Sequence, residues 1–482
     1  MAEKIELVDT VEHLGIRHHF EDEIADALRN SQHMELNSSN LHEVSLRFRL
    51  LREHGLCVSP DDFNRFKDTN GRFNIDIIKE PKGLLSLYNA AHLLTHDELE
   101  LEEAICFARL HLESMTHNLT YPLSDQVKRA LYLPLPRTVR RIEALHYMLE
   151  YEHEPSYNPI ILELAKIDFN ILQNHHLKEL KDLSEWWQDL YTEVSLDYAR
   201  DRIVQLYLWA HTMCYEEEYS CARIILTKLS AVVTMMDDTY DVRATLEESR
   251  NFNEAIQRWD EKAVCLLPDY LKKFYLRIII SFKEIEDMLQ PHEKYKVSYA
   301  KESFQILSKK YLQGAEWFHH KYVPTFKEKL EVSFMDSGSP FSIVALLVGL
   351  GDIASKEALY WAIGCTDMVK ACGELTRYMN DISALKHGNR KQDAANCVQC
   401  YIAEHNVTSE VATANISKMM EDAWKTTNKA VLELPTLHAV VRRVVDMTVC
   451  LTLIYGKKKD VFTFGNDLDD VIKHVFANPI PI

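Results

Sequence analysis

The strongest constraint on this sequence is its hydrophobic spacing, which follows the period of a helix along most of the chain. In residues 41–53 the apolar side chains fall on one helix face: Leu41, Val44, Phe48 and Leu51. Gly55 follows as a stop signal. The strict alternation that is typical of strands is hard to find, and no helical repeat array is visible. The spacing therefore predicts an all-α protein.

The length of 482 residues suggests more than one domain, although no Pro-, Gly- or Ser-rich linker separates the parts. Only 13 glycines and 14 prolines occur, which disfavours turn-dense β folds and Gly-rich nucleotide-binding loops. After Trp186-Trp187 the helices become longer and more apolar. We therefore expect two helical domains, residues 1–185 and residues 186–482.

The charge balance excludes several partners. Lys and Arg number 55 against 73 Asp and Glu, a net charge of −18, which argues against nucleic acid or an anionic membrane surface. Ten scattered cysteines form no disulfide framework and indicate a reducing compartment. Residues 1–9 hold no apolar signal segment, and the longest apolar stretch, 341–351, is too short to span a bilayer. We expect a cytoplasmic protein with no membrane partner.

A Cys-x-x-Cys string, Cys397 to Cys400, is the one pattern that resembles a zinc motif. No second pair with zinc-ligand spacing accompanies it. We interpret it as two thiols on a packed helix.

Three carboxylates follow a buried helix. Residues 224–236 contain one strongly polar side chain, Lys228, and lead directly into Asp237, Asp238 and Asp241. Asp237 and Asp241 are spaced to share one helix face. The next helix opens with a capping box from Thr245 to Glu248. Carboxylates at a helix C-terminus repel one another and the helix dipole, and a bound cation removes that conflict.

All-oxygen ligands of this kind suit Mg²⁺, which uses one or two carboxylates, waters and substrate phosphate oxygens. The alternative is a solvated acidic helix end, since D-D-x-x-D also arises by chance. The apolar run before the cluster favours the metal.

Cations and further polar groups lie elsewhere in the second half. Arg200 and Arg202 open a helix that also carries Trp209, and arginine pairs suit bidentate phosphate contacts, although surface arginines are the simpler reading. Arg377 and Asn380 share one face of a predicted helix over 374–387. Four and eight residues after Asn380 this helix offers only Ala384 and Gly388, which carry no metal ligand.

Over essentially its whole length the sequence resembles plant class I terpene synthases of the sesquiterpene type, of the cytosolic kind found in grasses. The segments that carry the resemblance are RFRLLREHGLCVSPDDFNRFKD (47–68), GLLSLYNAAHL (83–93), RTVRRIEALHYM (137–148), YARDRIVQLYLWA (198–210), MMDDTYDVRATLEE (235–248), AIQRWD (255–260), SGSP (337–340) and NPIPI (478–482). The resemblance implies a catalytically silent N-terminal helical domain and a C-terminal catalytic bundle. It also implies a monomer.

The resemblance assigns roles to single residues. Asp237 and Asp241 would bind Mg²⁺, with Asp238 beside them, and Mn²⁺ could substitute. A first metal ligand of a second motif falls at Asn380. The diphosphate-binding side chains would be Arg200, Arg202, Arg377 and Lys391. Trp209 matches an aromatic at the pocket floor, and Tyr455 and Asp460 match a pair on the C-terminal wall. Ser337-Gly338-Ser339 matches a kink that turns backbone carbonyls toward a cation.

The chain departs from the family pattern in its second metal motif. Ala384 and Gly388 stand where the family has Ser or Thr and then Glu. Ser383 and His387 lie near the same face, but His is a poor Mg²⁺ ligand. Phe462 stands where the C-terminal wall usually has Tyr.

The chemistry that the resemblance implies is metal-assisted ionisation of an allylic prenyl diphosphate, farnesyl diphosphate in particular, followed by carbocation cyclisation to a sesquiterpene hydrocarbon or alcohol. One rival is a catalytically impaired homologue that only binds isoprenoid diphosphates. A second rival is protonation-initiated cyclisation by the D-x-D-D string at 467–470, which we interpret as a surface helix. A helical scaffold protein is the third.

Overall fold

A computed structural model describes residues 2–34, 38–385, 395–456, 459–464 and 468–482, and the described residues form helices with no strand. Lys67 and Phe73 make one isolated antiparallel bridge. The expectation of an all-α fold is confirmed. Lys391 and Gly388, on which two of the predictions depend, lie outside the described residues.

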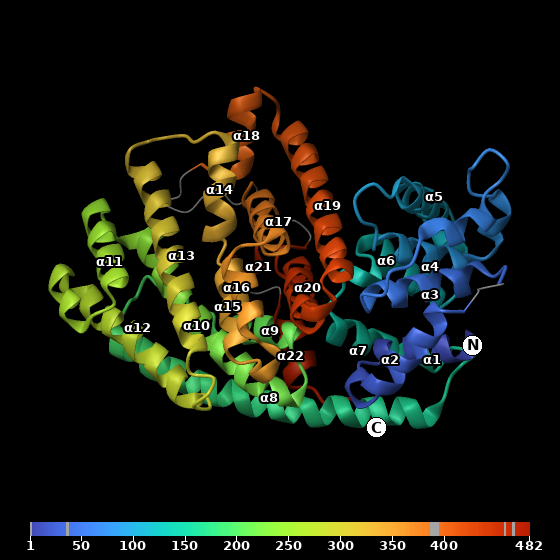
Figure 1. The fold of residues 1–482 in the computed structure, drawn as a ribbon, viewed down its shortest axis with the longest axis horizontal. Coiled ribbons are helices and arrows are strands. Elements are labelled where there is room, and N and C mark those ends of the chain that lie inside the picture. Colours follow the sequence, from blue (N-terminus) through green and yellow to red (C-terminus); the bar gives the residue numbers. More distant parts are fainter. Residues whose placement is uncertain (1, 35–37, 386–394, 457–458, 465–467) are drawn as a thin grey trace. The chain divides into compact units, whose positions relative to one another are not determined.

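The chain forms two compact units. Unit 1 comprises residues 1–173, 425–441 and 478–482, and unit 2 comprises residues 174–424 and 442–477. The division falls inside three continuous helices (Figure 1): α8 (Pro159–Val194), α19 (Ser409–Glu433) and α20 (His438–Ile454). The predicted domains 1–185 and 186–482 stay a prediction. A boundary at 185 lies within α8, and unit 1 gathers two later segments that a division at one point of the sequence omits.

Unit 1 packs amphipathic helices around two apolar clusters, one of which contains Val44, Phe48, Leu84 and Leu101. Its N-terminal α-helices are α1 (Ala2–His13), α2 (Glu21–Gln32), α3 (Leu41–Glu53), α4 (Pro81–Ala91), α5 (Leu99–Met115), α6 (Leu123–Tyr132) and α7 (Arg140–Tyr151). Short 3₁₀ segments are η1 (Arg17–His19), η2 (Pro60–Phe66), η3 (Ile75–Lys79), η4 (Thr116–Asn118), η5 (Leu135–Arg137) and η10 (Pro435–Leu437). The C-terminal tail also belongs to this unit. The side-chain amide of Asn170 donates to the Ile480 carbonyl at 2.9 Å, and its oxygen accepts from the Ile480 backbone amide at 2.8 Å.

Unit 2 is a bundle around two largely buried helices. These are α10 (Ser220–Asp238) and α15 (Ser339–Val348), which pack against each other (Figure 1). The remaining α-helices are α9 (Ile203–Met213), α11 (Leu246–Arg258), α12 (Asp269–Met288), α13 (Lys296–His319), α14 (Phe326–Asp336), α16 (Lys356–Ile363), α17 (Asp367–Ala384), α18 (Cys397–His405), α21 (Val461–Phe464) and α22 (Asp469–Phe476). Shorter segments are η6 (Glu217–Tyr219), the π-helical turn η7 (Thr239–Arg243), η8 (Glu261–Leu266) and η9 (Gly351–Ile353).

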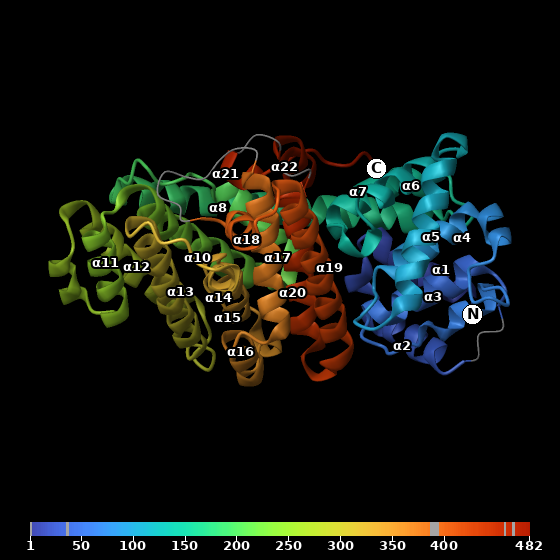
Figure 2. The ribbon, with the colours of Figure 1, turned by 90° about the horizontal axis from the view of Figure 1, so that it is seen from above.

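Helices α14 and α17 pack against each other within this bundle, and both contact α18, as Figure 2 shows from above. The close approach of α14 and α17 depends on Gly373, because a Cβ atom there would lie 2.5 Å from the carbonyl oxygen of Phe334. This packing brings the polar residues of α14 and α17 to the same side of the bundle.

Two segments of unit 2, Glu217–Arg243 and Phe326–Val348, are long and apolar enough to cross a membrane. Of their most apolar windows, 67% and 61% are buried inside the protein, as in core helices of a bundle. Such segments are weak evidence for a membrane span, and the absence of a membrane partner stays a prediction.

Candidate active site

A cavity of about 220 Å³ opens in unit 2 beside the carboxylate cluster. Apolar and aromatic side chains line it, among them Leu206, Trp209, Leu226, Val233 and Phe462. Charged groups also line it. The carboxylates are Asp237, Asp241, Asp336, Asp381 and Asp460, and the cations are Arg200, Lys329 and Arg377. The excess of carboxylates favours a cation as an additional occupant.

The carboxylate cluster lies where α10 changes to a π-helical turn. Helix α10 ends at Asp238, and η7 covers residues 239–243, with the Ala244 amide donating to the carbonyl oxygen of Thr239 at 2.9 Å. The wider turn still leaves Asp237 and Asp241 on the cavity, while Asp238 is buried beside them and does not line it. The predicted capping box of Thr245 and Glu248 opens α11 and is confirmed.

Asp238 holds Arg200 in place. Its Oδ2 atom accepts hydrogen bonds from the Arg200 backbone amide at 2.8 Å and from Nε at 3.1 Å. The Arg200 Nη2 atom donates to Asp237 Oδ2 at 2.7 Å. Burial raises the pKa of Asp238 above its usual value, although the Arg200 charge opposes that shift. Arg200 therefore bridges Asp237 and Asp238 and is itself fixed at the edge of the cavity.

Arg200 and Arg202 both contact α21, which carries Phe462 and Thr463. The Arg200 Nη1 atom donates to Thr463 Oγ1 at 3.3 Å. Arg202 does not line the cavity; its Nε atom donates to the Phe462 carbonyl at 2.7 Å and Nη2 to the Thr463 carbonyl at 3.0 Å. Arg202 thereby holds α21 against the cavity.

The predicted aromatic floor also lies in this cavity. Trp209 meets Phe462 edge to face, with ring centroids 6.2 Å apart. Tyr311, which the sequence pattern did not identify, lines the cavity and is 7% exposed. Burial, followed by the charges of Asp237, Asp336 and Asp241, raises the pKa of Tyr311 well above its ordinary value. The phenol stays neutral, so its ring presents an aromatic face rather than a charge.

A hydrogen-bonded chain connects α17 to the C-terminal wall. Arg377 Nη2 donates to Asn380 Oδ1 at 2.7 Å, and Asn380 Nδ2 donates to Asp460 Oδ2 at 3.1 Å. Asp460 Oδ1 accepts from the Thr463 amide at 2.8 Å. Tyr455 lies on the same cavity, and burial followed by the Asp460 charge raises its pKa. Arg377, Asn380, Tyr455 and Asp460 are thus brought together.

Arg377 also contacts two carboxylates, Asp336 on α14 at 3.4 Å and Asp381 at 3.5 Å. Burial lowers the pKa of Arg377, but these carboxylates outweigh burial and raise the pKa above its ordinary value. Asp336 was not identified from the sequence. Its only signal there is its position next to Ser337-Gly338-Ser339.

The kink at Ser337-Gly338-Ser339 is the break between α14 and α15. Gly338 has φ +77°, in the left-handed region that glycine adopts most easily. Ser337 and Gly338 line the cavity, whereas Ser339 is buried and its hydroxyl hydrogen-bonds that of Thr376 at 2.6 Å.

The donor atoms at the first motif fit Mg²⁺, because Asp237 and Asp241 offer carboxylate oxygens on one cavity wall. The described part of the second motif is poor in metal ligands. Asn380 Oδ1 accepts one hydrogen bond from Arg377, the Ser383 hydroxyl donates to the Met379 carbonyl at 2.8 Å, and Ala384 has no ligand atom. The role of Asn380 as a metal ligand stays a prediction, since its amide oxygen keeps a second lone pair.

The Cys-x-x-Cys string and the D-x-D-D string lie in surroundings that indicate neither a zinc site nor a catalytic acid. Cys397 and Cys400 are buried at the start of α18, and burial raises the pKa of Cys400 to about 11, which disfavours the thiolate that zinc requires. Asp469 and Asp470 are exposed in the first turn of α22, as expected of a surface helix.

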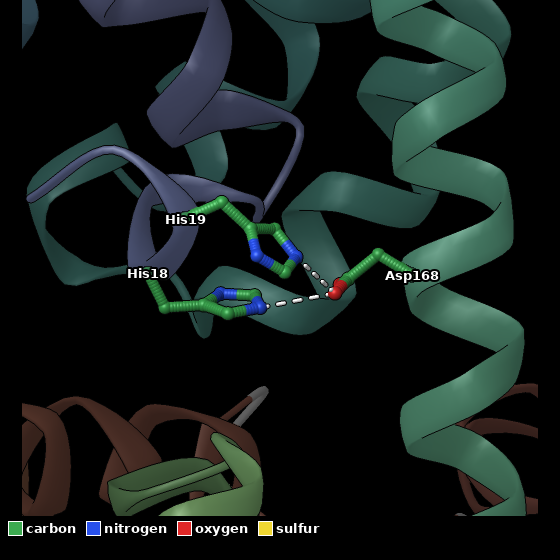
Figure 3. A group of neighbouring side chains, drawn as sticks. All are labelled: His18, His19 and Asp168. Carbon is green, nitrogen blue, oxygen red and sulfur yellow. Dashed lines mark hydrogen bonds and ion pairs between the residues drawn. The ribbon is translucent and has the colours of Figure 1, made fainter.

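One group of three possible metal ligands lies in unit 1 (Figure 3). Both Nε2 atoms of His18 and His19 hydrogen-bond Oδ1 of Asp168, at 3.0 and 2.8 Å. Arg141 Nη1 lies 3.6 Å from the other oxygen of Asp168. The carboxylate is thus already paired with an arginine and two imidazoles, and we interpret the group as an ion-pair network that joins η1 to α8.

Comparison with known proteins gives the same picture along the whole chain. Residues 188–426 match the family model described as terpene synthase family, metal binding domain, and residues 1–131 match terpene synthase, N-terminal domain. The chain is 51% identical to tau-cadinol synthase of Zea mays over 490 residues, with 100% of this chain and 89% of that protein covered. It is 47% identical to alpha-copaene synthase of Zea mays, with 100% and 92% covered.

Solved structures agree in fold. Isoprene synthase of grey poplar, solved with three Mg²⁺ ions and dimethylallyl-S-thiolodiphosphate, is 29% identical with a TM-score of 0.89, and 99% of this chain and 92% of that chain are covered. Limonene synthase with 2-fluorolinalyl diphosphate is 28% identical with a TM-score of 0.91, covering 100% and 91%.

Proposed function

Because this chain belongs to the terpene synthase family, we propose that its cavity in unit 2 ionises farnesyl diphosphate and cyclises the carbocation that forms. The chain is a class I terpene synthase with the function of a sesquiterpene synthase. Divalent metal and a small prenyl diphosphate belong to this function, since a related structure holds Mg²⁺ and a diphosphate analogue. The single observation that carries the proposal is one cavity lined by carboxylates, arginines and aromatic rings together.

In the first step, the bond between C1 of the substrate and the diphosphate oxygen breaks, and its electron pair leaves with the diphosphate. Asp237 and Asp241 would hold Mg²⁺, which when bound supplies positive charge to the departing anion. Arg200 and Arg377 line the same cavity and present guanidinium groups that suit phosphate oxygens. Lys391, which lies outside the described residues, remains a predicted diphosphate ligand.

In the second step, the allylic cation closes rings against the apolar part of the cavity. The ring of Trp209 stabilises positive charge there by about 0.5–2 kcal/mol, whereas the ring of Phe462 already lies under the Arg200 guanidinium. Apolar walls and the contacts of Arg202 with α21 exclude water until the final cation loses a proton or captures water. The atoms balance as one sesquiterpene, one diphosphate and one released proton, with one water consumed as well when the product is an alcohol.

The test is incubation of the purified protein with farnesyl diphosphate and Mg²⁺, with extracts analysed by gas chromatography–mass spectrometry. We expect a metal-dependent C15 product that Asp237→Ala abolishes. Absence of product with diphosphate binding intact would identify the impaired homologue instead, for which the misfit of the second motif is the specific observation. The double variant Ala384→Ser, Gly388→Glu then measures how much activity is lost through the departure from the family's second metal motif.

A cytoplasmic location and a monomeric state are further proposals. All ten cysteines are free, as suits a reducing compartment. Cell fractionation and light scattering test these two points.

A further inference from the structure

Lys329 is a buried cation on the cavity that no mechanism above uses. It lies on the buried face of α14 together with Phe326, Val332 and Ser333, and it is 6% exposed. Its ammonium lies 5.9 Å from the ring centroid of Trp317, over the aromatic face. Within the part of the chain that the structure describes, no hydrogen bond or ion pair reaches this ammonium.

The position of Lys329 coincides with the incomplete second motif. The Phe326 amide, at the start of α14, donates to Glu404 of α18 at 2.6 Å, and Phe326 packs in one apolar cluster with Ile382 of α17. The first turn of α14 therefore adjoins the last turns of α17. Lys329 is one turn beyond Phe326, and Ala384 is two residues beyond Ile382. Both line the cavity, together with Asp381.

Charge explains why the buried ammonium of Lys329 lies next to the incomplete second metal motif. A buried ammonium without an anionic partner is costly, and a bound anion removes that cost. Asp381 does not serve as the partner, because its Oδ2 accepts from the Cys397 amide at 2.7 Å and its Oδ1 lies 3.5 Å from Arg377 Nε. The anion that suits this cavity is the diphosphate of the substrate.

We propose that the Lys329 ammonium binds the substrate diphosphate at the α14–α17 end of the cavity, in place of a metal ion held by residues 380–388. This inference rests on the proposed function. In this arrangement the diphosphate lies between two cationic groups of different origin. One is Mg²⁺ at Asp237 and Asp241, and the other is the side chain of Lys329. The departing anion is neutralised from both sides even though the described part of the second motif on α17 offers few ligands for a metal.

The test is calorimetric titration of inorganic pyrophosphate into the full-length protein, once with saturating Mg²⁺ and once with EDTA. Lys329→Met removes the charge and keeps the length of the side chain. Lys327→Met, on the exposed side of the same helix, is the matched control. We expect pyrophosphate binding to weaken about tenfold or more in Lys329→Met under both conditions, to stay within about twofold in Lys327→Met, and to recover largely in Lys329→Arg.

The number of bound metals is an independent measurement. Equilibrium dialysis with Mn²⁺ and pyrophosphate should give fewer than the three divalent ions seen in the poplar enzyme. Three ions in the wild type would overturn the idea that Lys329 replaces one. Thermal unfolding of each variant shows whether it is folded, and Lys329→Gln serves if the Met variant is not.

Failure of this inference differs from failure of the proposed function. If the wild type forms a C15 product and binds pyrophosphate, but folded Lys329→Met binds it equally well, only the role of Lys329 is wrong. If the wild type neither forms product nor binds pyrophosphate, both proposals are wrong.

Discussion

At the scale of single residues, two neighbouring carboxylates have different surroundings and therefore different expected roles. Asp237 lines the cavity, whereas Asp238 is 1% exposed and holds the backbone and side chain of Arg200. The sequence predicted Asp237 and Asp241 on one helix face with Asp238 beside them, but it gave no partner for Asp238. Only the folded position of Arg200 shows that partner.

Substitution of each carboxylate by its amide should separate these roles. We expect Asp237→Asn to raise the Mg²⁺ concentration for half-maximal activity by about tenfold or more, because it removes a ligand charge at the cavity. It should lower Tm less than Asp238→Asn does, because its ion pair with Arg200 is more exposed. Asp238→Asn should lower the free energy of unfolding by about 3 kcal/mol, because it breaks a buried ion pair. Steady-state kinetics and thermal unfolding measure both effects. Asp197→Asn, at an exposed site nearby, should change neither quantity.

Besides Tyr311, two charged residues of the cavity, Lys329 and Asp336, were not predicted from the sequence. They lie seven residues apart, on one face of α14, and both line the cavity. A charged residue on an amphipathic helix is normally solvated, so the spacing alone gives no reason to place either side chain inside. Their burial results from packing against α17, which local pattern does not report.

At the scale of elements, prediction succeeded where helices follow one period or carry a residue-type signal at their ends, and failed at two interruptions that carry no such signal. The expected segment 41–53 is α3, and the apolar stretch 224–236 lies within α10. The π-helical turn at 239–243 and the end of α17 at Ala384 were not foreseen. In a π turn the backbone amide bonds the carbonyl five residues earlier instead of four, and no residue type in the sequence marks that change.

Two cavity glycines should respond oppositely to substitution by alanine. Gly338 has φ +77°, so Gly338→Ala should destabilise the protein by about 1 kcal/mol. Gly314 is inside α13, so Gly314→Ala should stabilise it by about 0.5–1 kcal/mol. An added Cβ meets no atom within 4 Å at either position, so the difference reports the backbone alone. Urea denaturation measures both values, and equal effects would contradict the assignment of Gly338.

The contact between Arg202 and α21 gives a second prediction for an element. Arg202→Met removes the two hydrogen bonds to the Phe462 and Thr463 carbonyls and keeps most of the apolar stem. We expect kcat/KM to fall about tenfold and the hydroxylated share of the products to rise, because α21 covers the cavity less well. Product analysis by gas chromatography measures the share. An unchanged product ratio in a folded variant would mean that α21 does not control water access.

At the scale of the whole molecule, the two units draw on segments that are far apart in sequence. The apolar character of residues 186 onward correctly suggested a second bundle, but residues 425–441 and 478–482 belong with unit 1. Their assignment depends on tertiary contacts, such as those of Asn170 with Ile480, that no local signal carries. A whole-chain resemblance can therefore predict the fold without showing which late segments of the chain pack with the first unit.

Unit 1 should lose stability in acid, because its His42 is largely shielded from solvent close to Lys82 and Arg49. Burial, followed by the charge of Lys82, lowers the pKa of His42 to about 4, with Arg49 acting in the same direction and Asp9 and Glu154 against it. Its Nδ1 atom hydrogen-bonds Ser86 Oγ at 2.7 Å. The imidazole is therefore neutral in the folded protein at pH values where the unfolded chain begins to bind a proton.

The sign of the pH effect follows from that difference in pKa. The stability contributed by neutral His42 is complete above the unfolded pKa of about 6.5, falls as the pH drops toward 4, and is lost below it. Between pH 7.5 and pH 5 we expect a loss of about 1–2 kcal/mol from this residue. His42→Gln should remove that part of the pH dependence, whereas His146→Gln, at an exposed site of unit 1, should retain it. Urea denaturation at both pH values measures the difference between variants, so contributions from all other titrating groups cancel. An equal pH dependence in wild type and His42→Gln would mean that His42 titrates alike in the folded and unfolded chains.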